Sequence, residues 1–261
     1  MRDVLDRAMQ TLVVAVVLLV FTHTLQANEF KVVYAQGYLP FSWSDEDGKA
    51  LGAEIDFINE ILKKRMGIKV SHHVYPWARA QSMVEKGSAD AFVTIPNAKR
   101  RQYTQVSDIP FFSSNFLMHI GSGNAKISQL KKISSLAQLL THKDIVHGHI
   151  VGGGWHKVKL KSANLVQKAT NSLQILEMLD RNRVDVYIEQ APLIRYQMKI
   201  LGFEGRIIEL PQVMDETQWH ICISKKSNYV KILPELNQLL KEMQGDGSLA
   251  QLQKKIFKQY Q

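Results

Sequence analysis

Short apolar runs and helically spaced apolar residues alternate along the first half of the chain. Runs typical of strands cover residues 30–35, 68–74 and 90–94. Between them, apolar residues recur three or four positions apart over 55–62 and 80–84, which is the spacing of one buried helix face. This strand–helix–strand–helix–strand order predicts a mostly parallel sheet covered by helices.

The second half shows the same order of elements without a repeat of the sequence itself. Strands are predicted over 145–151 and 184–188, with a helix between them over 173–179. Two extended apolar segments, 111–120 and 218–224, lie at the junctions between the halves. The pattern therefore predicts two α/β lobes, with one crossing into the second lobe and one crossing back.

We assign residues 28–114 and 216–261 to lobe 1 and residues 115–215 to lobe 2. The apolar spacing of 233–260 predicts helices at the end of lobe 1. Two lobes joined by two hinge crossings are expected to hold a ligand in the cleft between them, at the ends of the sheet strands. Closure of the cleft around the ligand is the expected motion.

The first 27 residues have a different pattern. Arg2 and Arg7 precede an apolar run over 12–21, and a short polar stretch then ends at Ala27. The run is about half the length that a membrane-spanning helix needs. This order predicts a secretory signal peptide over 1–27 and export of the mature chain to the periplasm. An uncleaved anchor or a buried helix is the alternative.

Charge and rare residues add little further chemistry. The chain has 33 basic and 24 acidic residues, a net charge of +9, but the lysines are spread along its whole length. No nucleic-acid motif is visible, so we expect no nucleic-acid partner. The single cysteine, Cys222, is predicted to be a buried thiol in a strand. His147, His149 and His156 lack the spacing of a metal site, so no metal and no cofactor is predicted.

Four stretches carry a family resemblance through their order and spacing. They are 37–56, 76–90, 96–110 (which contains Pro96-Asn97-Ala98-Lys99-Arg100, similar to a Pro-Thr-x-Glu-Arg segment) and 179–189. Together they resemble the bacterial extracellular solute-binding proteins of family 3, over essentially the whole chain after residue 27. The resemblance implies the two-lobed type 2 periplasmic binding fold.

The resemblance also implies a ligand site in lobe 1. Arg100 stands where the family's arginine holds the ligand carboxylate, and a planar guanidinium matches a carboxylate with two parallel hydrogen bonds. Thr94 would add a hydroxyl to that carboxylate. Tyr38 and Trp77 follow strand ends and would pack against the ligand. Each has an ordinary structural alternative, as a solvated cation, a strand-end threonine or core aromatics.

In lobe 2 we expect a cleft wall at the turn 152–154, followed by Trp155, and a second contact at Asn171, in a helix-capping sequence. Family members that bind amino acids carry an aspartate for the ligand ammonium near this point of the last predicted strand. Here Gln190 falls at its counted place, and Glu189 stands one residue earlier. We take Glu189 as the candidate, and Gln190 stays open as the alternative.

These features predict a monomeric, non-enzymatic receptor that captures a small polar solute, an amino acid or related carboxylate, for the permease of an ABC transporter. Two alternatives remain open. One is an enzyme on the same fold, similar to cyclohexadienyl dehydratases, and the other is a ligand-sensing module.

Overall fold

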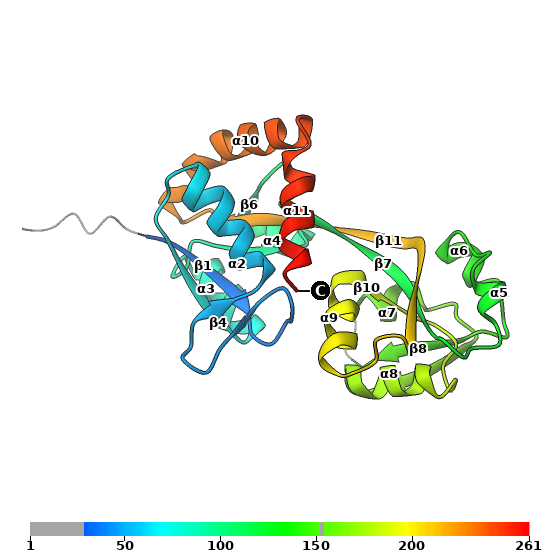
Figure 1. Cartoon of the computed structure of the whole chain (residues 1–261). Coiled ribbons are helices and arrows are strands. Elements are labelled where there is room, and N and C mark those ends of the chain that lie inside the picture. Colours follow the sequence, from blue (N-terminus) through cyan, green and yellow to red (C-terminus); the bar gives the residue numbers. More distant parts are fainter. Residues whose placement is uncertain (1–28, 152–153, 261) are drawn as a thin grey trace, which may run out of the picture.

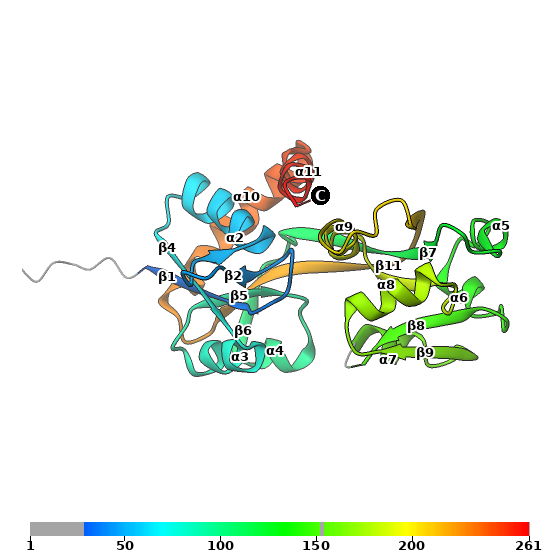
Figure 2. The same ribbon diagram turned by 60° about the horizontal axis from the view of Figure 1, so that its bottom comes forward.

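The computed structural model describes residues 29–151 and 154–260, in which the chain forms two bodies side by side (Figure 1). Two long strands, β7 (Phe112–Gly121) and β11 (Ile207–Ser224), run from one body to the other in both views (Figures 1 and 2). They pair antiparallel over their lengths, from Phe112 opposite Trp219 to Gly121 opposite Ile207. The register shifts between Leu210 and Asp215, so the strand β11 is irregular there.

The first body is built on a sheet whose parallel part is β4–β1–β5. Its strands are β1 (Phe30–Ala35), β4 (Val70–Tyr75) and β5 (Ala91–Thr94), with β11 and β6 (Thr104–Val106) added antiparallel. The predicted strands of the first half are confirmed within two residues. A two-stranded hairpin, β2 (Trp43–Ser44) and β3 (Ala50–Leu51), fills the connection after β1.

Helices cover both faces of this sheet (Figure 2). They are α2 (Ala53–Ile58) with the π-helical η1 (Asn59–Arg65), α3 (Trp77–Lys86), α4 (Ala98–Tyr103), the 3₁₀ turn η2 (Asn228–Ile232), α10 (Leu233–Gly245) and α11 (Ser248–Lys258). The helix α3 ends at Gly87, whose φ of 80° is left-handed and suits glycine. The apolar stripe predicted over 55–62 packs inward, with Phe57, Ile58 and Ile61 fully buried.

The second body has two kinds of strand pairing. Its parallel pair is β8 (Val146–Ile150) and β9 (Leu165–Ala169), whereas β10 (Tyr187–Gln190) pairs antiparallel with β7. Its helices are α5 (Ile127–Leu130), α6 (Leu136–Leu139), α7 (Gly154–Lys159), α8 (Ser172–Asp180) and α9 (Ala191–Ile200). The predicted strand 184–188 is shifted: Val186 forms one parallel bridge with His147, and the continuous strand starts at Tyr187.

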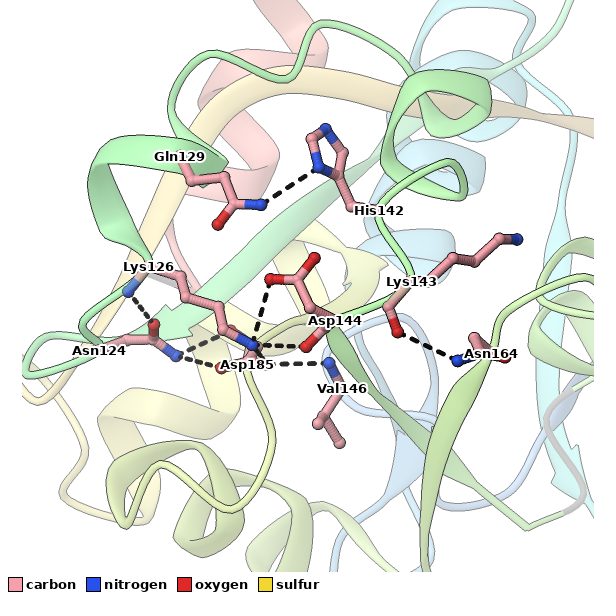
Figure 3. Close-up of polar contacts among 9 residues, drawn as sticks. All are labelled: Asn124, Lys126, Gln129, His142, Lys143, Asp144, Val146, Asn164 and Asp185. Atoms are coloured by element: carbon pink, nitrogen blue, oxygen red, sulfur yellow. Dashed lines mark hydrogen bonds and ion pairs between the residues drawn. The ribbon is translucent and has the colours of Figure 1, made fainter.

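A buried carboxylate holds the far end of this body together (Figure 3). Asp185 Oδ2 accepts hydrogen bonds from Lys126 Nζ and the Val146 backbone N–H, both at 2.8 Å, and Asn124 Nδ2 donates to Oδ1 at 3.1 Å. Lys126 also donates to the backbone oxygen of Asp144. The turn after β7, the start of β8 and the segment before β10 therefore meet on one side chain.

Cys222 is fully buried in β11, as predicted. Burial raises the pKa of its thiol to about 12, so the group is neutral. Among the described residues, no helix is long and apolar enough to cross a membrane. The predicted signal peptide, residues 1–27, lies outside the described residues.

Candidate functional site

Two neighbouring cavities lie at the end of the first sheet, and they share Gly37 and Tyr38. The first has a volume of about 350 Å³ and lies against the first body. The second, of about 310 Å³, is lined by residues of both bodies. The two share the loop after β1, so they form a divided cleft. The lining of the first is Ala35, Gln36, Gly37, Tyr38, Glu54, Trp77, Val93, Thr94 and Trp219.

Tyr38 stands between the two cavities. The loop that carries it folds back on itself, because the Tyr38 and Ser42 backbones form an isolated antiparallel bridge. Its ring stacks on Phe41, with centroids 4.9 Å apart, and lies 5.9 Å from the Trp219 ring. Its hydroxyl accepts a hydrogen bond of 2.8 Å from Gln190 Nε2. Tyr38 therefore connects the two bodies across the cleft.

Trp77 and Thr94 both line the first cavity. Trp77 is the first residue of α3, and its ring meets Phe92 edge-on at 5.3 Å between centroids. Thr94 is the last residue of β5, lies opposite His220 in register and is 5% exposed. The ends of a strand and a helix thus present an indole and a hydroxyl to the same space.

Arg100 lies behind this wall and is not among the residues that line either cavity. Its guanidinium carbon is 5.3 Å from the centroid of the Trp77 ring. Nη1 donates to the Ile95 backbone oxygen at 2.6 Å, and Nε donates to Gln81 Oε1 at 3.3 Å. Within the described residues it forms no ion pair with a carboxylate. The cation is therefore held by two neutral oxygens and one aromatic ring.

Trp155 lies at the hinge and lines neither cavity. Its ring stacks on Phe116 of β7 at 4.5 Å between centroids, and its Nε1 donates to Asp215 Oδ2 of β11 at 2.7 Å. The same Asp215 carboxylate pairs with Lys159 at 2.9 Å. These contacts attach α7 to both crossing strands. Trp155 therefore stabilises the hinge and does not line the cleft. Residues 152–153 of the predicted cleft wall lie outside the described residues.

Asn171 caps the helix α8, because its side-chain oxygen accepts a 2.9 Å hydrogen bond from the Gln174 backbone N–H. It is exposed and lines neither cavity. The next residue, Ser172, lines the second cavity.

Glu189 lines the second cavity, whereas Gln190 is almost fully buried beside it. Glu189 Oε2 accepts a hydrogen bond of 3.1 Å from the Tyr187 hydroxyl, and Oε1 accepts one of 2.9 Å from the Gln190 backbone N–H. Burial raises the pKa of this carboxyl, against the effect of those two donors. Within the described residues it has no cationic partner.

The side-chain amide of Gln190, unlike the Glu189 carboxyl, already makes a contact across the cleft. Its Nε2 donates to Tyr38, and its Oε1 is a buried oxygen without a hydrogen-bond partner among the described residues. Of the two alternatives, Glu189 is therefore the one that offers a carboxylate to the cleft.

Glu54 and Trp219 both line the first cavity, although neither was predicted from the sequence as a site residue. Glu54 is the second residue of α2 and only 2% exposed. Trp219 is 6% exposed, and its Nε1–H has no hydrogen-bond partner among the described residues. Glu54 was visible in the stretch 37–56, but nothing in the sequence showed that its side chain would be buried.

His156 and Tyr187 of the second cavity were also missed. Their rings stack at 5.2 Å with an angle of 3° between planes, and His156 Nε2 bonds to the Ile188 backbone oxygen at 2.8 Å. Burial lowers the pKa of His156 to about 4, so the imidazole is neutral at pH 7. This wall of the cleft is aromatic and neutral around the single carboxyl of Glu189.

The profile of the bacterial extracellular solute-binding proteins, family 3, matches residues 30–259, which include both bodies and the whole cleft. The chain belongs to this family. Among curated proteins it is similar to the L-cystine-binding protein TcyA of Bacillus subtilis (strain 168), with 23% identity over 222 residues, 84% of this chain and 78% of that protein.

Two solved structures share the fold at low identity. Substrate-binding domain 2 of Lactococcus lactis GlnP, in an open conformation, is 20% identical and has a TM-score of 0.66, with 89% of this chain and 97% of that chain covered. The ancestral amino acid-binding protein AncCDT-1, described as a precursor of cyclohexadienyl dehydratase, is 22% identical and has a TM-score of 0.60, with 89% and 96% covered. The family 3 chain therefore has the two-lobed fold, and it is a solute-binding protein.

Proposed function

We propose that the protein captures an amino acid or a closely related carboxylate in the cleft beside Tyr38 and delivers it to the permease of an ABC transporter. Family membership supports solute binding. The relatives named for L-cystine and for amino acids support the solute class. We further propose that the chain acts as a monomer in the periplasm, reached through a signal peptide over 1–27.

One observation carries the proposal: Glu189 is a half-buried carboxyl at a cleft wall, with its pKa raised by burial, and lacks a cationic partner among the described residues. A partly desolvated carboxylate without a cationic partner is costly, and an ammonium from the solute would lower that cost. The two donors already on Glu189 hold its oxygens in place for such a contact. Glu189 is therefore the proposed site for the α-ammonium.

Arg100 is the proposed partner of the carboxylate, with Thr94 beside it. Its bond to Gln81 is long, at 3.3 Å, so exchange of this partner for a carboxylate costs little. Since the Trp77 ring separates Arg100 from the cavity, we propose that the guanidinium turns past that ring when the solute binds.

We propose lobe 1 as 28–114 and 216–261 and lobe 2 as 115–215, with both boundaries inside the paired strands β7 and β11. Trp155 and Asn171 are then proposed to shape the cleft indirectly, from the hinge and from the cap of α8. Binding would close the lobes, as in other two-lobed receptors.

A thermal-shift screen of the mature chain against amino acids, organic acids and polyamines tests the proposal. A ligand that binds only the folded state raises the melting temperature. We expect at least one amino acid to do so, and Glu189→Gln to abolish the shift while the exposed Glu235→Gln keeps it. A shift with organic acids or polyamines alone would contradict the amino-acid assignment. Turnover of arogenate or prephenate would instead show an enzyme.

A further inference from the structure

A second carboxyl, Glu54, is buried in the first cavity on the other side of Tyr38. It lies in the first turn of α2 and is 2% exposed, yet it lines the space together with Trp77 and Trp219. A carboxyl is rarely buried unless it is paired or hydrogen-bonded. Its place at a cavity wall means that a ligand can reach it.

Glu54 has no side-chain hydrogen bond and no ion pair with any described residue, and its environment disfavours the charged form. Burial raises the pKa of the Glu54 carboxyl to about 8. The carboxyl lies at the N-terminal end of α2, whose partial positive charge stabilises the anion and so acts against the effect of burial. Without a ligand the group is therefore mostly protonated at pH 7, and it needs a cation to become a stable anion.

The rest of the first cavity suits a cation as well. The rings of Tyr38, Trp77 and Trp219 line it, and aromatic faces attract ammonium and guanidinium groups. The cavity, of about 350 Å³, is large enough for a flexible side chain. Because Glu189 lies in the adjoining cavity, one solute that passes Tyr38 could reach both carboxyls.

We propose that Glu54 recognises a cationic group on the side chain of the solute and releases its proton when that group binds. The solute class is then an amino acid with a basic side chain. This proposal rests on the proposed function, since it assumes that Glu189 holds the α-ammonium.

The neighbouring tyrosines and His72 do not titrate between pH 6 and pH 8. Tyr34 of β1 and Tyr38 act electrostatically with Glu54, and burial raises the pKa of both hydroxyls above their ordinary value of 10. His72 of β4, hydrogen-bonded to Tyr34, has its pKa lowered by burial to about 4. On its own helix, Asp56 accepts a hydrogen bond from Tyr260. The pKa of Glu189, which also acts electrostatically on Tyr38, is raised by burial as well, so the Glu54 variant is needed to assign a released proton to Glu54.

Isothermal titration calorimetry with L-lysine and L-norleucine at pH 7, in phosphate and in Tris buffer, tests the proposal. The two probes have the same α-carbon groups and similar length, but only lysine has a side-chain cation. We expect lysine to bind at least tenfold more tightly and to release close to one proton more than norleucine does, seen as a buffer-dependent difference in enthalpy. The lysine affinity should rise about tenfold from pH 6 to pH 7 and less steeply toward pH 8, as Glu54 passes through its pKa.

Glu54→Gln should remove the additional proton release and the preference for lysine while it keeps the norleucine affinity, and Glu235→Gln should change neither. Equal affinities of the wild type for the two probes, or lysine binding without additional proton release, would overturn the proposal and leave the proposed function intact. Binding of neither these probes nor any other amino acid would overturn both. The wild-type measurement decides the matter even where the Glu54 variant folds poorly.

Discussion

Asp185 and Glu54 are two buried carboxyls with opposite surroundings. Asp185 accepts hydrogen bonds from an ammonium, a side-chain amide and a backbone N–H, and its pKa is lowered because these contacts outweigh the effect of burial (Figure 3). Glu54 has no such partner among the described residues, and its pKa is raised. Asp185 is not among the residues that line either cavity, whereas Glu54 lines the first.

The difference separates carboxyls that hold the fold from carboxyls that wait for a ligand. A satisfied buried charge joins segments distant in sequence, and its loss leaves other groups unpaired. An unsatisfied one costs stability and is expected where function needs it. Arg100, which has only neutral oxygens around it, belongs with Glu54 in this respect.

Arg100→Ala gives the largest expected effect. If Arg100 holds the carboxylate of the solute, loss of Arg100 should weaken binding by about 2–4 kcal/mol, because the carboxylate of the bound solute is left without a cationic partner. Calorimetry with the solute found by the screen measures this. The neighbouring exposed Arg101→Ala is the control, and unchanged affinity of the Arg100 variant would refute the clamp.

Asp185→Ala should lower the free energy of unfolding by about 2–3 kcal/mol, because Lys126 loses the nearer of its two ion-pair partners and the Val146 N–H loses its acceptor. Urea denaturation measures the change, and Asp144→Ala, at the exposed edge of the network, should cost less than about 1 kcal/mol. Equal losses of unfolding free energy in the two variants would show that Asp185 contributes no more to stability than Asp144 does.

Glu54→Gln should leave the free energy of unfolding without ligand unchanged or raise it by about 1 kcal/mol, because it replaces a buried ionisable group by a neutral one of the same shape. Urea denaturation at pH 8 measures this free energy of unfolding. A loss comparable to that of Asp185→Ala would mean that Glu54 has an essential structural contact, and the comparison would fail.

The pH dependence of unfolding should separate the two carboxyls by the sign of their contributions. The raised pKa of Glu54 means that the folded state binds its proton more tightly, so its contribution to stability declines as pH rises from about 4.5 to 8. The lowered pKa of Asp185 gives a contribution present above its ordinary value and lost as pH falls through the folded-state value. Glu54→Gln should flatten the melting temperature between pH 6 and 8, and a slope equal to that of the wild type would contradict this assignment.

The sequence predicted most of the fold because apolar periodicity is local. The strands β1, β4, β5 and β7 and the helices α2, α3 and α8 lie where the spacing of apolar residues indicated. The strand β9 was missed, since residues 165–169 are mostly exposed and lack an apolar pattern. The strand predicted over 184–188 begins too early, because residues 184–186 are buried like a strand but form only one isolated bridge, at Val186.

The site was harder to predict because it depends on which side chains meet across the cleft. Tyr38, Trp77, Thr94 and Glu189 do line it, since each follows or ends a strand that points there. Trp155 turned out to stack on a hinge strand, a contact between residues 39 positions apart that no local pattern reveals. Glu54 could not be distinguished from a solvated helix-start carboxylate, because its burial arises only from tertiary packing.

The crystal structure of the protein with the amino acid found by the screen tests the central claim most directly. The account predicts that the solute lies beside Tyr38, with its ammonium at Glu189 and its side chain between Trp77 and Trp219. A solute bound outside this cleft, or bound in it with both Glu189 and Glu54 more than 5 Å from any of its nitrogen atoms (well beyond hydrogen-bond distance), would contradict the account.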